Sequence, residues 1–229
     1  MAFGGLRTTF KNSATSIGTS IAATGSQLVA NGDLIFVLGG EQLALTITGV
    51  TDNLGNSYTS TDNSVNDAGT STGRAFWARA STSGILTTVT IACNGGTNNG
   101  VIVVAIIEGP ITNAIDKNPA NITSDIASPF VCQTTGTLSQ ANEIVIGWLV
   151  GTGSTVNTAT SPNLLADQQA TATILHATIG YQAVTVTTAV TPTFAAASNP
   201  TDQLMGVATF RRDETPLGAG RQLGMQWLP

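Results

Sequence analysis

The longest apolar run of the chain extends from Val101 to Ile107, and it is bounded by Gly100 before it and by Gly109-Pro110 after it. The run is rich in β-branched residues. It is also too short for a membrane span and is not typical of a helix. The pattern therefore predicts a central strand that is buried on both faces and around which the remaining elements gather.

Shorter apolar or alternating segments predict further strands, with turn residues between them. The stretch Asp52-Asn-Leu-Gly-Asn56 is typical of a tight turn, because Asn and Gly accept a positive φ and the Asp side chain can bind backbone amides. No segment has helical periodicity over three turns, and the connection from 111 to 129 is expected to cross one end of the fold. The predicted strands are residues 33–38, 43–50, 74–79, 86–93, 101–107, 130–135, 143–150, 174–181, 184–190 and 204–211.

A faint internal repeat suggests two related halves. Residues 27–40 resemble residues 140–151, since each stretch has an Asn, then an acid, then an apolar run closed by Gly. Each is followed by a Thr/Val strand and by a final apolar strand. Two halves of about four strands predict two packed sheets related by a pseudo-twofold, as in a jelly roll of two Greek keys.

Length and composition favour one all-β domain with one core. The chain has 229 residues and 25 glycines. Its 9% of charged residues lies far below the roughly 25% of ordinary domains, so Thr-rich strand faces and Gly/Asn/Ser-rich loops must supply the polar surface. We expect an N-terminal arm with a first weak strand (1–25), an antiparallel jelly-roll-like β-sandwich (26–212) and a C-terminal arm (213–229). The start resembles no secretory signal and no apolar run could span a membrane, so we expect cytosolic synthesis and no membrane partner.

Charge is unevenly distributed along the chain. Residues 12–210 hold three Lys or Arg against eleven Asp or Glu, whereas residues 1–11 and 211–229 hold the other five basic residues. An acidic body repels phosphate backbones, which argues against a nucleic-acid partner. The two basic ends also carry Phe, Leu, Met and Trp in Gly-rich surroundings.

Candidate chemistry is weak. His176 is the sole histidine, and no nucleophile motif accompanies it, so it is interpreted as structural. Glu108 and Asp116 could form a glycosidase pair, although caps of turns explain them more simply. The Asp52 turn and the 62–66 loop offer oxygen ligands for Ca²⁺, but Asx turns account for both. We expect no enzyme, no cofactor and no metal.

The two cysteines, Cys93 and Cys132, could pair if the fold brings them together. In a large chain without a secretory signal, reduced and buried cysteines are the more common outcome. We therefore expect both to be small hydrophobic core residues.

The ends of the chain are the best candidates for partner binding. Arginine makes charge-assisted bonds with carboxylates, and an exposed Trp is a typical anchor. One alternative is that these segments fold back on their own sandwich. The predicted partner-binding residues are Arg7, Lys11, Arg211, Arg212, Arg221 and Trp227.

Several short motifs within residues 26–212 resemble β-sandwich modules of phage virion proteins, namely capsid decoration (cement) proteins, and related bacterial surface modules. The motifs are Val50-Thr-Asp-Asn-Leu-Gly-Asn-Ser-Tyr58, Phe76-Trp77-Ala78, Thr88-Val-Thr90, Glu108-Gly109, Asp116 and Asn142-Glu-Ile-Val-Ile146.

The resemblance implies a non-catalytic structural virion protein made in the host cytoplasm. It would be a homotrimer whose terminal arms hold the major capsid protein or another virion protein. A tail or fibre adhesin that binds host surface glycans, and more remotely a glycan hydrolase, remain as alternatives.

Overall fold

A computed structural model describes residues 3–42, 46–61, 65–67, 71–94, 98–119, 122–124, 129–152, 157–161, 168–172, 175–196 and 201–214. None of these residues is helical, and more than half of the chain lies in strands, so the predicted all-β class is confirmed. No helix that is long and apolar enough to cross a membrane occurs in the described ranges.

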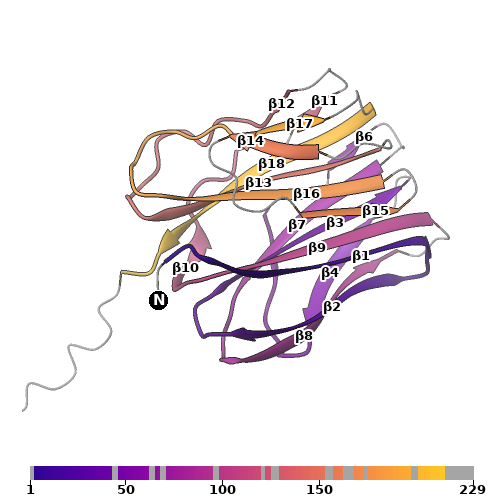
Figure 1. The fold of residues 1–229 in the computed structure, drawn as a ribbon, viewed down its shortest axis with the longest axis horizontal. Coiled ribbons are helices and arrows are strands. Elements are labelled where there is room, and N and C mark those ends of the chain that lie inside the picture. Colours follow the sequence, from indigo (N-terminus) through magenta and orange to yellow (C-terminus); the bar gives the residue numbers. More distant parts are fainter. Residues whose placement is uncertain are drawn as a thin grey trace, which may run out of the picture.

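The strands fall into two consecutive sets, which we call the first half (6–107) and the second half (111–212) (Figure 1). The first half contains β1 (Leu6–Ile17), β2 (Ser20–Val29), β3 (Leu34–Gln42), β4 (Ile47–Asp52), β5 (Thr59–Ser60), β6 (Val65–Asp67), β7 (Ser71–Arg79), β8 (Gly84–Cys93) and β9 (Asn98–Ile107). The second half contains β10 (Ile111–Ile115), β11 (Ile122–Ser124), β12 (Phe130–Val131), β13 (Glu143–Thr152), β14 (Asn157–Ser161), β15 (Gln168–Ala172), β16 (Leu175–Val184), β17 (Thr193–Ala196) and β18 (Thr201–Arg212).

Each half forms one large and one small antiparallel sheet, and the strand orders of the two halves match. In the first half, sheet A has the order β1-β9-β3-β7-β5, with β6 also paired to β7, and sheet B has the order β2-β8-β4. In the second half, sheet C has the order β10-β18-β13-β16-β15, with β11 also on β18, and sheet D has the order β12-β17-β14. The repeat seen in the sequence therefore corresponds to β3 and β13, which occupy the same place in their halves.

The four sheets stack in the order B, A, C, D (Figure 1). One hydrophobic cluster lies between sheets B and A, a second between A and C, and a third between C and D. Sheets A and C are thus covered on both faces. This explains why β9 and β13 lack the alternation of polar and apolar residues that a sheet with one wet face would show.

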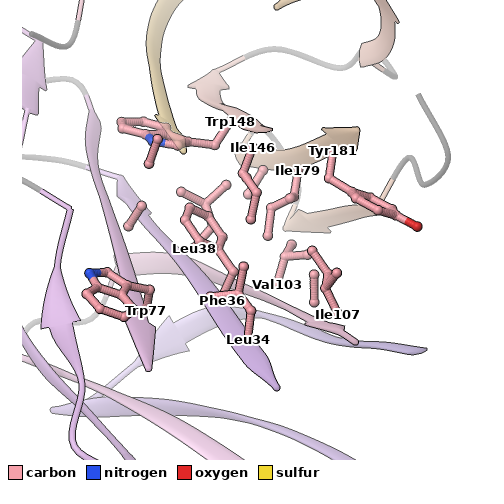
Figure 2. Close-up of a cluster of buried hydrophobic side chains, with 14 of the residues drawn as sticks. Leu34, Phe36, Leu38, Trp77, Val103, Ile107, Ile146, Trp148, Ile179 and Tyr181 are labelled. Carbon is pink, nitrogen blue, oxygen red and sulfur yellow. The ribbon is translucent and has the colours of Figure 1, made fainter. Parts of the chain in front are cut away.

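The predicted central strand is confirmed. Residues 101–107 lie in β9, between β1 and β3, and each of them is at most 2% exposed. Side chains from sheets A and C point toward one another across the middle of the stack (Figure 2). The ring of Phe210 from β18 contacts Trp77 at 5.3 Å and Phe36 at 6.2 Å between centroids.

The packing of sheet A on sheet C shows how the halves are aligned. Phe36, near the start of β3, contacts Phe210, which lies opposite Ile144 near the start of β13. At the other ends of these strands, a Cβ on Gly40 would lie 2.8 Å from a methyl group of Val150, so only glycine allows this approach. The starts of β3 and β13 therefore lie at the same end of the molecule.

Four expectations need correction. The strands expected at 130–135 and 184–190 extend no further than Val131 in β12 and Val184 at the end of β16. Residues 6–25, expected as an arm with one weak strand, lie mostly in the long strands β1 and β2, because Phe10, Ile17 and Ile21 face the cluster between sheets A and B. The connection 111–129 contains β10 and β11, which pair with β18. Instead of one core with one sheet per half, each half supplies two sheets and the described residues form three clusters. Beyond residue 214 the expected C-terminal arm lies outside the described residues.

Candidate functional site: the charged end of the sandwiches

Charged side chains gather at the end of the molecule where β3 and β13 begin and where β9 and β18 finish; we call it the charged end. Both halves contribute, and the two ends of the described chain meet here. The Arg212 guanidinium lies over the ring of Phe3 at 5.6 Å, and the Asp213 amide donates to the carbonyl of Pro110 at 2.9 Å.

The first half holds a buried acid, Asp33, that is fully supplied with donors. Its carboxylate accepts from Arg7 Nε at 2.6 Å, from the Ala30 amide at 2.8 Å and from the Gly109 amide at 2.9 Å. Arg7 Nη1 also lies 3.3 Å from Glu108 Oε1. Because the side chains of Arg7 and Asp33 are only 13% and 3% exposed, the pair is screened little by solvent.

Local backbone geometry brings Arg7 and the chain after β9 close to Asp33. Arg7 lies at a register shift between Leu6 and Thr8 in the pairing of β1 with β9, as expected for a β-bulge that redirects a side chain. Gly32 has φ +93°, and a Cβ on Gly109 would lie 2.0 Å from the Gly32 carbonyl oxygen. Glycine at both positions therefore lets the chain after β9 approach Asp33. The Gly109-Pro110 peptide is cis.

The second half places Glu143 where the first half has Asp33. Asn142, with φ 62°, precedes Glu143 as Gly32 precedes Asp33. Glu143 is fully buried; its Oε1 accepts from the Gln140 amide at 3.1 Å, and its Oε2 has no donor. The two buried acids are thus in matching places but have different numbers of partners.

Asp116 takes the place of Arg7 in the second half. The Asp116 amide donates to the Thr209 carbonyl, and the Thr209 amide donates to the Lys117 carbonyl, both at 2.9 Å. Asp116 and Lys117 both lie opposite Thr209, which makes a β-bulge like the one at Arg7. The Asp116 carboxylate accepts from the Ser139 amide at 3.0 Å and lies 3.6 Å from Arg211 Nε. The first strand of the large sheet thus carries a base in the first half and an acid in the second half. The last strand of the large sheet carries an acid in the first half and a base in the second half.

The exchange brings two carboxyl groups together. Burial raises the pKa of Glu143, the Gln140 amide lowers it in part, and the nearby Asp116 carboxylate raises it further. Burial raises the pKa of Asp116, but hydrogen bonds from Ser139 and the charges of Lys117 and Arg211 lower it by more. The net effect is a lowered pKa. Of the two carboxyl groups, Glu143 is therefore the one whose protonated form is favoured.

A different polar group lies at the opposite end of sheet A. Glu41 is fully buried between sheets A and B, beside the Cys93 thiol. Burial raises the pKa of Glu41, and the Cys93 thiol lowers it in part. The pKa of Cys93 is raised by burial and by Glu41, so this thiol is held in its protonated, unreactive form.

His176 and the cysteines are core residues. His176 is fully buried, with Nε2 3.3 Å from Gln203 Oε1. Its interpretation as a structural residue agrees with this position. Cys93 and Cys132 are free, buried and in different hydrophobic clusters, with sheets A and C between them. A disulfide between them is excluded by this separation.

The Asp52 turn has the Asx geometry that its sequence predicts. The Asp52 carboxylate accepts from the Leu54 and Asn56 amides and from the Tyr58 hydroxyl, at 2.8–3.1 Å. These donors use the oxygens that a Ca²⁺ ion would need. Residues 62–64 of the second suggested loop lie outside the described residues. In the described ranges, no three His, Cys, Asp or Glu side chains come together as a metal-binding group.

The proposed glycosidase carboxylates belong to separate networks. Glu108 pairs with Arg7, whereas Asp116 pairs with Lys117 and Arg211. Each acid is thus neutralised by a base of its own half. This arrangement accounts for both acids as parts of the fold.

The predicted partner-binding residues are in different environments. Arg7 lies inside the first network, where its guanidinium pairs with Asp33 and Glu108 and its side chain is mostly buried. Lys11 is exposed on β1, and the Arg211 side chain is 36% exposed beside Asp116. Arg212 lies over Phe3. Arg221 and Trp227 lie outside the described residues.

The sequence interpretation did not find the roles of Asp33 and Glu143. The repeat did contain the signal, because both acids follow an Asn and precede the apolar run. No match was found among protein-family models, curated proteins or solved structures.

Proposed function

We propose that the protein is a non-enzymatic structural virion protein, a capsid decoration (cement) subunit that works as a homotrimer on the major capsid protein or another virion protein. The observation that carries this proposal is the nesting of strand pairs. In the first half, β1 pairs with β9, β2 with β8 and β3 with β7. A long hairpin rolled up in this way gives a jelly-roll-like sandwich, an architecture found in viral capsid and lectin domains.

The second half supports the same interpretation. Here β12 pairs with β17 and β13 with β16, while β18 returns beside β10, β11 and β13. The two halves pack through their large sheets, which share one buried hydrophobic cluster. Fold analogy alone does not define a role, so the particle must be tested directly.

The partner contacts that we propose are Lys11 and Arg212 from the described chain, Arg211 where it is exposed, and Arg221 and Trp227 beyond it. Replacing a central Trp anchor costs about 2 kcal/mol or more, which lowers affinity roughly thirtyfold. The experiment compares particle decoration by wild type, Trp227→Ala and a chain that stops after Asp213. Equal decoration by the shortened chain would contradict the proposal.

The alternative function, an adhesin for host glycans, is favoured by one observation. An open depression beside the end of β16 combines amide and hydroxyl groups with apolar side chains, and it is lined by Gln182, Val184, Val186, Thr188, Ala189, Val190 and Thr191. It has no aromatic side chain on which a sugar ring could stack, so we rank this function second. Saccharide binding that is lost in Gln182→Ala and Thr188→Ala, without particle decoration, would reverse this ranking.

A further inference from the structure

Two basic side chains at the charged end share a single carboxylate. Lys117 Nζ lies 3.8 Å from one oxygen of Asp116, and Arg211 Nε lies 3.6 Å from the other. Both separations are longer than a hydrogen bond. The two basic side chains are 32% and 36% exposed, whereas that of Asp116 is 5% exposed. The charge that faces solvent at this point is therefore positive.

The shared carboxylate is already engaged by better donors. Asp116 accepts from the Ser139 amide at 3.0 Å, and the Ser139 hydroxyl also hydrogen-bonds to it. Among the described residues, neither Lys117 Nζ nor the Arg211 guanidinium forms a hydrogen bond, and Arg211 Nε is itself buried. Ammonium and guanidinium groups carry several donors each. The pair can therefore accept a further anion.

The matching network of the first half has no such capacity. There one base, Arg7, lies between two acids; it donates to Asp33 at 2.6 Å and lies 3.3 Å from Glu108. In the second half one acid lies between two bases. Glu143, the other acid nearby, accepts from the Gln140 amide, and its raised pKa favours the uncharged form. The unmatched positive charge thus belongs to the second half.

The backbone holds both bases in place. The Lys117 amide donates to Thr209 Oγ1 at 3.0 Å, and the Lys117 carbonyl accepts from the Thr209 amide at 2.9 Å. Arg211 lies in β18, directly opposite Glu143 of β13. Groups whose backbone is already fixed lose less conformational entropy on binding. Arg and Lys also form charge-assisted hydrogen bonds with carboxylates.

We propose that Lys117 and Arg211 form an anion-binding site that receives a carboxylate group from an acidic segment of a protein partner. One carboxylate matches the single positive charge by which the two bases exceed Asp116. A phosphate group carries more charge and is a poorer match, and the acidic body of the chain repels it further. The proposal gives the chemistry of the partner, and in that respect it rests on the function proposed above.

The test measures binding of a fluorescein-labelled hexaglutamate peptide to the full-length chain by fluorescence anisotropy, with hexaglutamine as the neutral reference. We expect only hexaglutamate to bind, and less tightly as salt is added, because exposed charges are screened. Arg211→Met and Lys117→Met should each weaken binding severalfold. Asp116→Asn should strengthen it, because this substitution removes the carboxylate that competes with the peptide. A purely structural role of the two bases would not produce this increase.

Arg79→Met is the matched control. Arg79 lies at the same end of the molecule and is 30% exposed, but its guanidinium already donates to the Ile111 carbonyl at 2.8 Å. The substitution removes one positive charge, as Arg211→Met does, and should change the affinity for hexaglutamate much less. Circular dichroism verifies that each variant is folded.

Three results would overturn the proposal. Absence of hexaglutamate binding to wild type would show that the two bases receive no carboxylate. Equal losses in Arg79→Met and Arg211→Met would show attraction to the whole charged end without a site. Displacement of the peptide by inorganic phosphate more readily than by acetate, at equal ionic strength, would make phosphate the ligand.

Particle decoration by the same variants separates this proposal from the function proposed above. Loss of decoration in Lys117→Met/Arg211→Met supports the site. Decoration that persists in this double variant would overturn the site as a partner contact and leave the function intact. Failure of the wild-type chain to decorate particles would overturn the function, while binding of hexaglutamate would still support the site.

Discussion

The two halves place a buried acid at the same point of the same fold and stabilise it by different means. Asp33 faces Arg7, which neutralises it and also binds Glu108. Glu143 faces Asp116, so its pKa is raised by burial and by a second carboxylate, which favours its protonated form. One backbone arrangement thus accepts either an ion pair or a protonated carboxyl group, provided that the buried acid never remains charged and alone.

Replacement of Arg7 should change the free energy of unfolding more than any other substitution in the two networks. Arg7→Met leaves the carboxylate of Asp33 buried without its cation and should destabilise the protein by about 3–5 kcal/mol. Urea unfolding followed by circular dichroism measures the change. The double variant Arg7→Met/Asp33→Asn should recover part of the loss, because no buried charge then remains. Equal stability of Arg7→Met and wild type would show that the pair contributes nothing.

Glu41 gives the next largest expected effect, with the opposite sign. Its carboxyl group is fully buried with the Cys93 thiol, a weak donor, as its hydrogen-bond partner, and a poorly satisfied buried polar group typically costs about 1–3 kcal/mol. Glu41→Met keeps the length of the side chain and removes the polar group, so the variant should be more stable than wild type at pH 7. The matching position in the second half is Gly151, where a Cβ would clash with Gln203, so Gly151→Met is a destabilising control. A less stable Glu41→Met variant would mean that the hydrogen bond with Cys93 outweighs the cost of burying the carboxyl group.

A pH series sharpens the contrast between the acids. The folded pKa of Glu143 is raised, so its contribution to stability is complete below the unfolded pKa and is lost as pH rises through the folded pKa. Asp116, with a lowered pKa, loses its contribution as pH falls. Glu143→Gln copies the protonated acid and should flatten the decline of stability on the alkaline side. Glu41 has a raised pKa as well, so the comparison is best made in the Glu41→Met background.

The relevant range is about pH 5 to pH 8, above the ordinary carboxyl pKa. If stability declines with pH as steeply in Glu143→Gln as in wild type over this range, the assignment of the proton to Glu143 is contradicted. Thermal unfolding monitored at several pH values gives this slope directly. Asp116→Asn should instead flatten the acid side of the curve.

The smallest expected effect concerns Arg211. It pairs with Asp116 at 3.6 Å, but its side chain is 36% exposed, so solvent screens the pair. Exposed ion pairs contribute about 0–1 kcal/mol, and Arg211→Met should therefore change stability by less than about 1 kcal/mol. The ratio between the effects of Arg7→Met and Arg211→Met measures the difference between the halves. Similar losses for both variants would show that the two networks are equivalent.

The sequence predicted the elements whose signal is local. The run 101–107 and the repeated stretches at 27–40 and 140–151 correspond to β9, β3 and β13. The number of sheets was predicted wrongly, as two instead of the four in the described residues, because β12 and β17 of sheet D are too short to show a period. The partners of the buried acids could not be predicted either. Arg7 is 26 residues from Asp33, and the registers of β1 and β3 against β9 bring them together.

The packing of sheet A against sheet C has a consequence for the order of synthesis. The pairing of β1 with β9 joins residues about one hundred positions apart, so the first half closes only after β9 has left the ribosome. At that moment Leu34, Phe36 and Leu38 still face water, because the side chains that cover them belong to β13, β16 and β18. The nascent first half is therefore a closed sandwich with an uncovered hydrophobic face, and it must wait for the second half or for a chaperone to shield it.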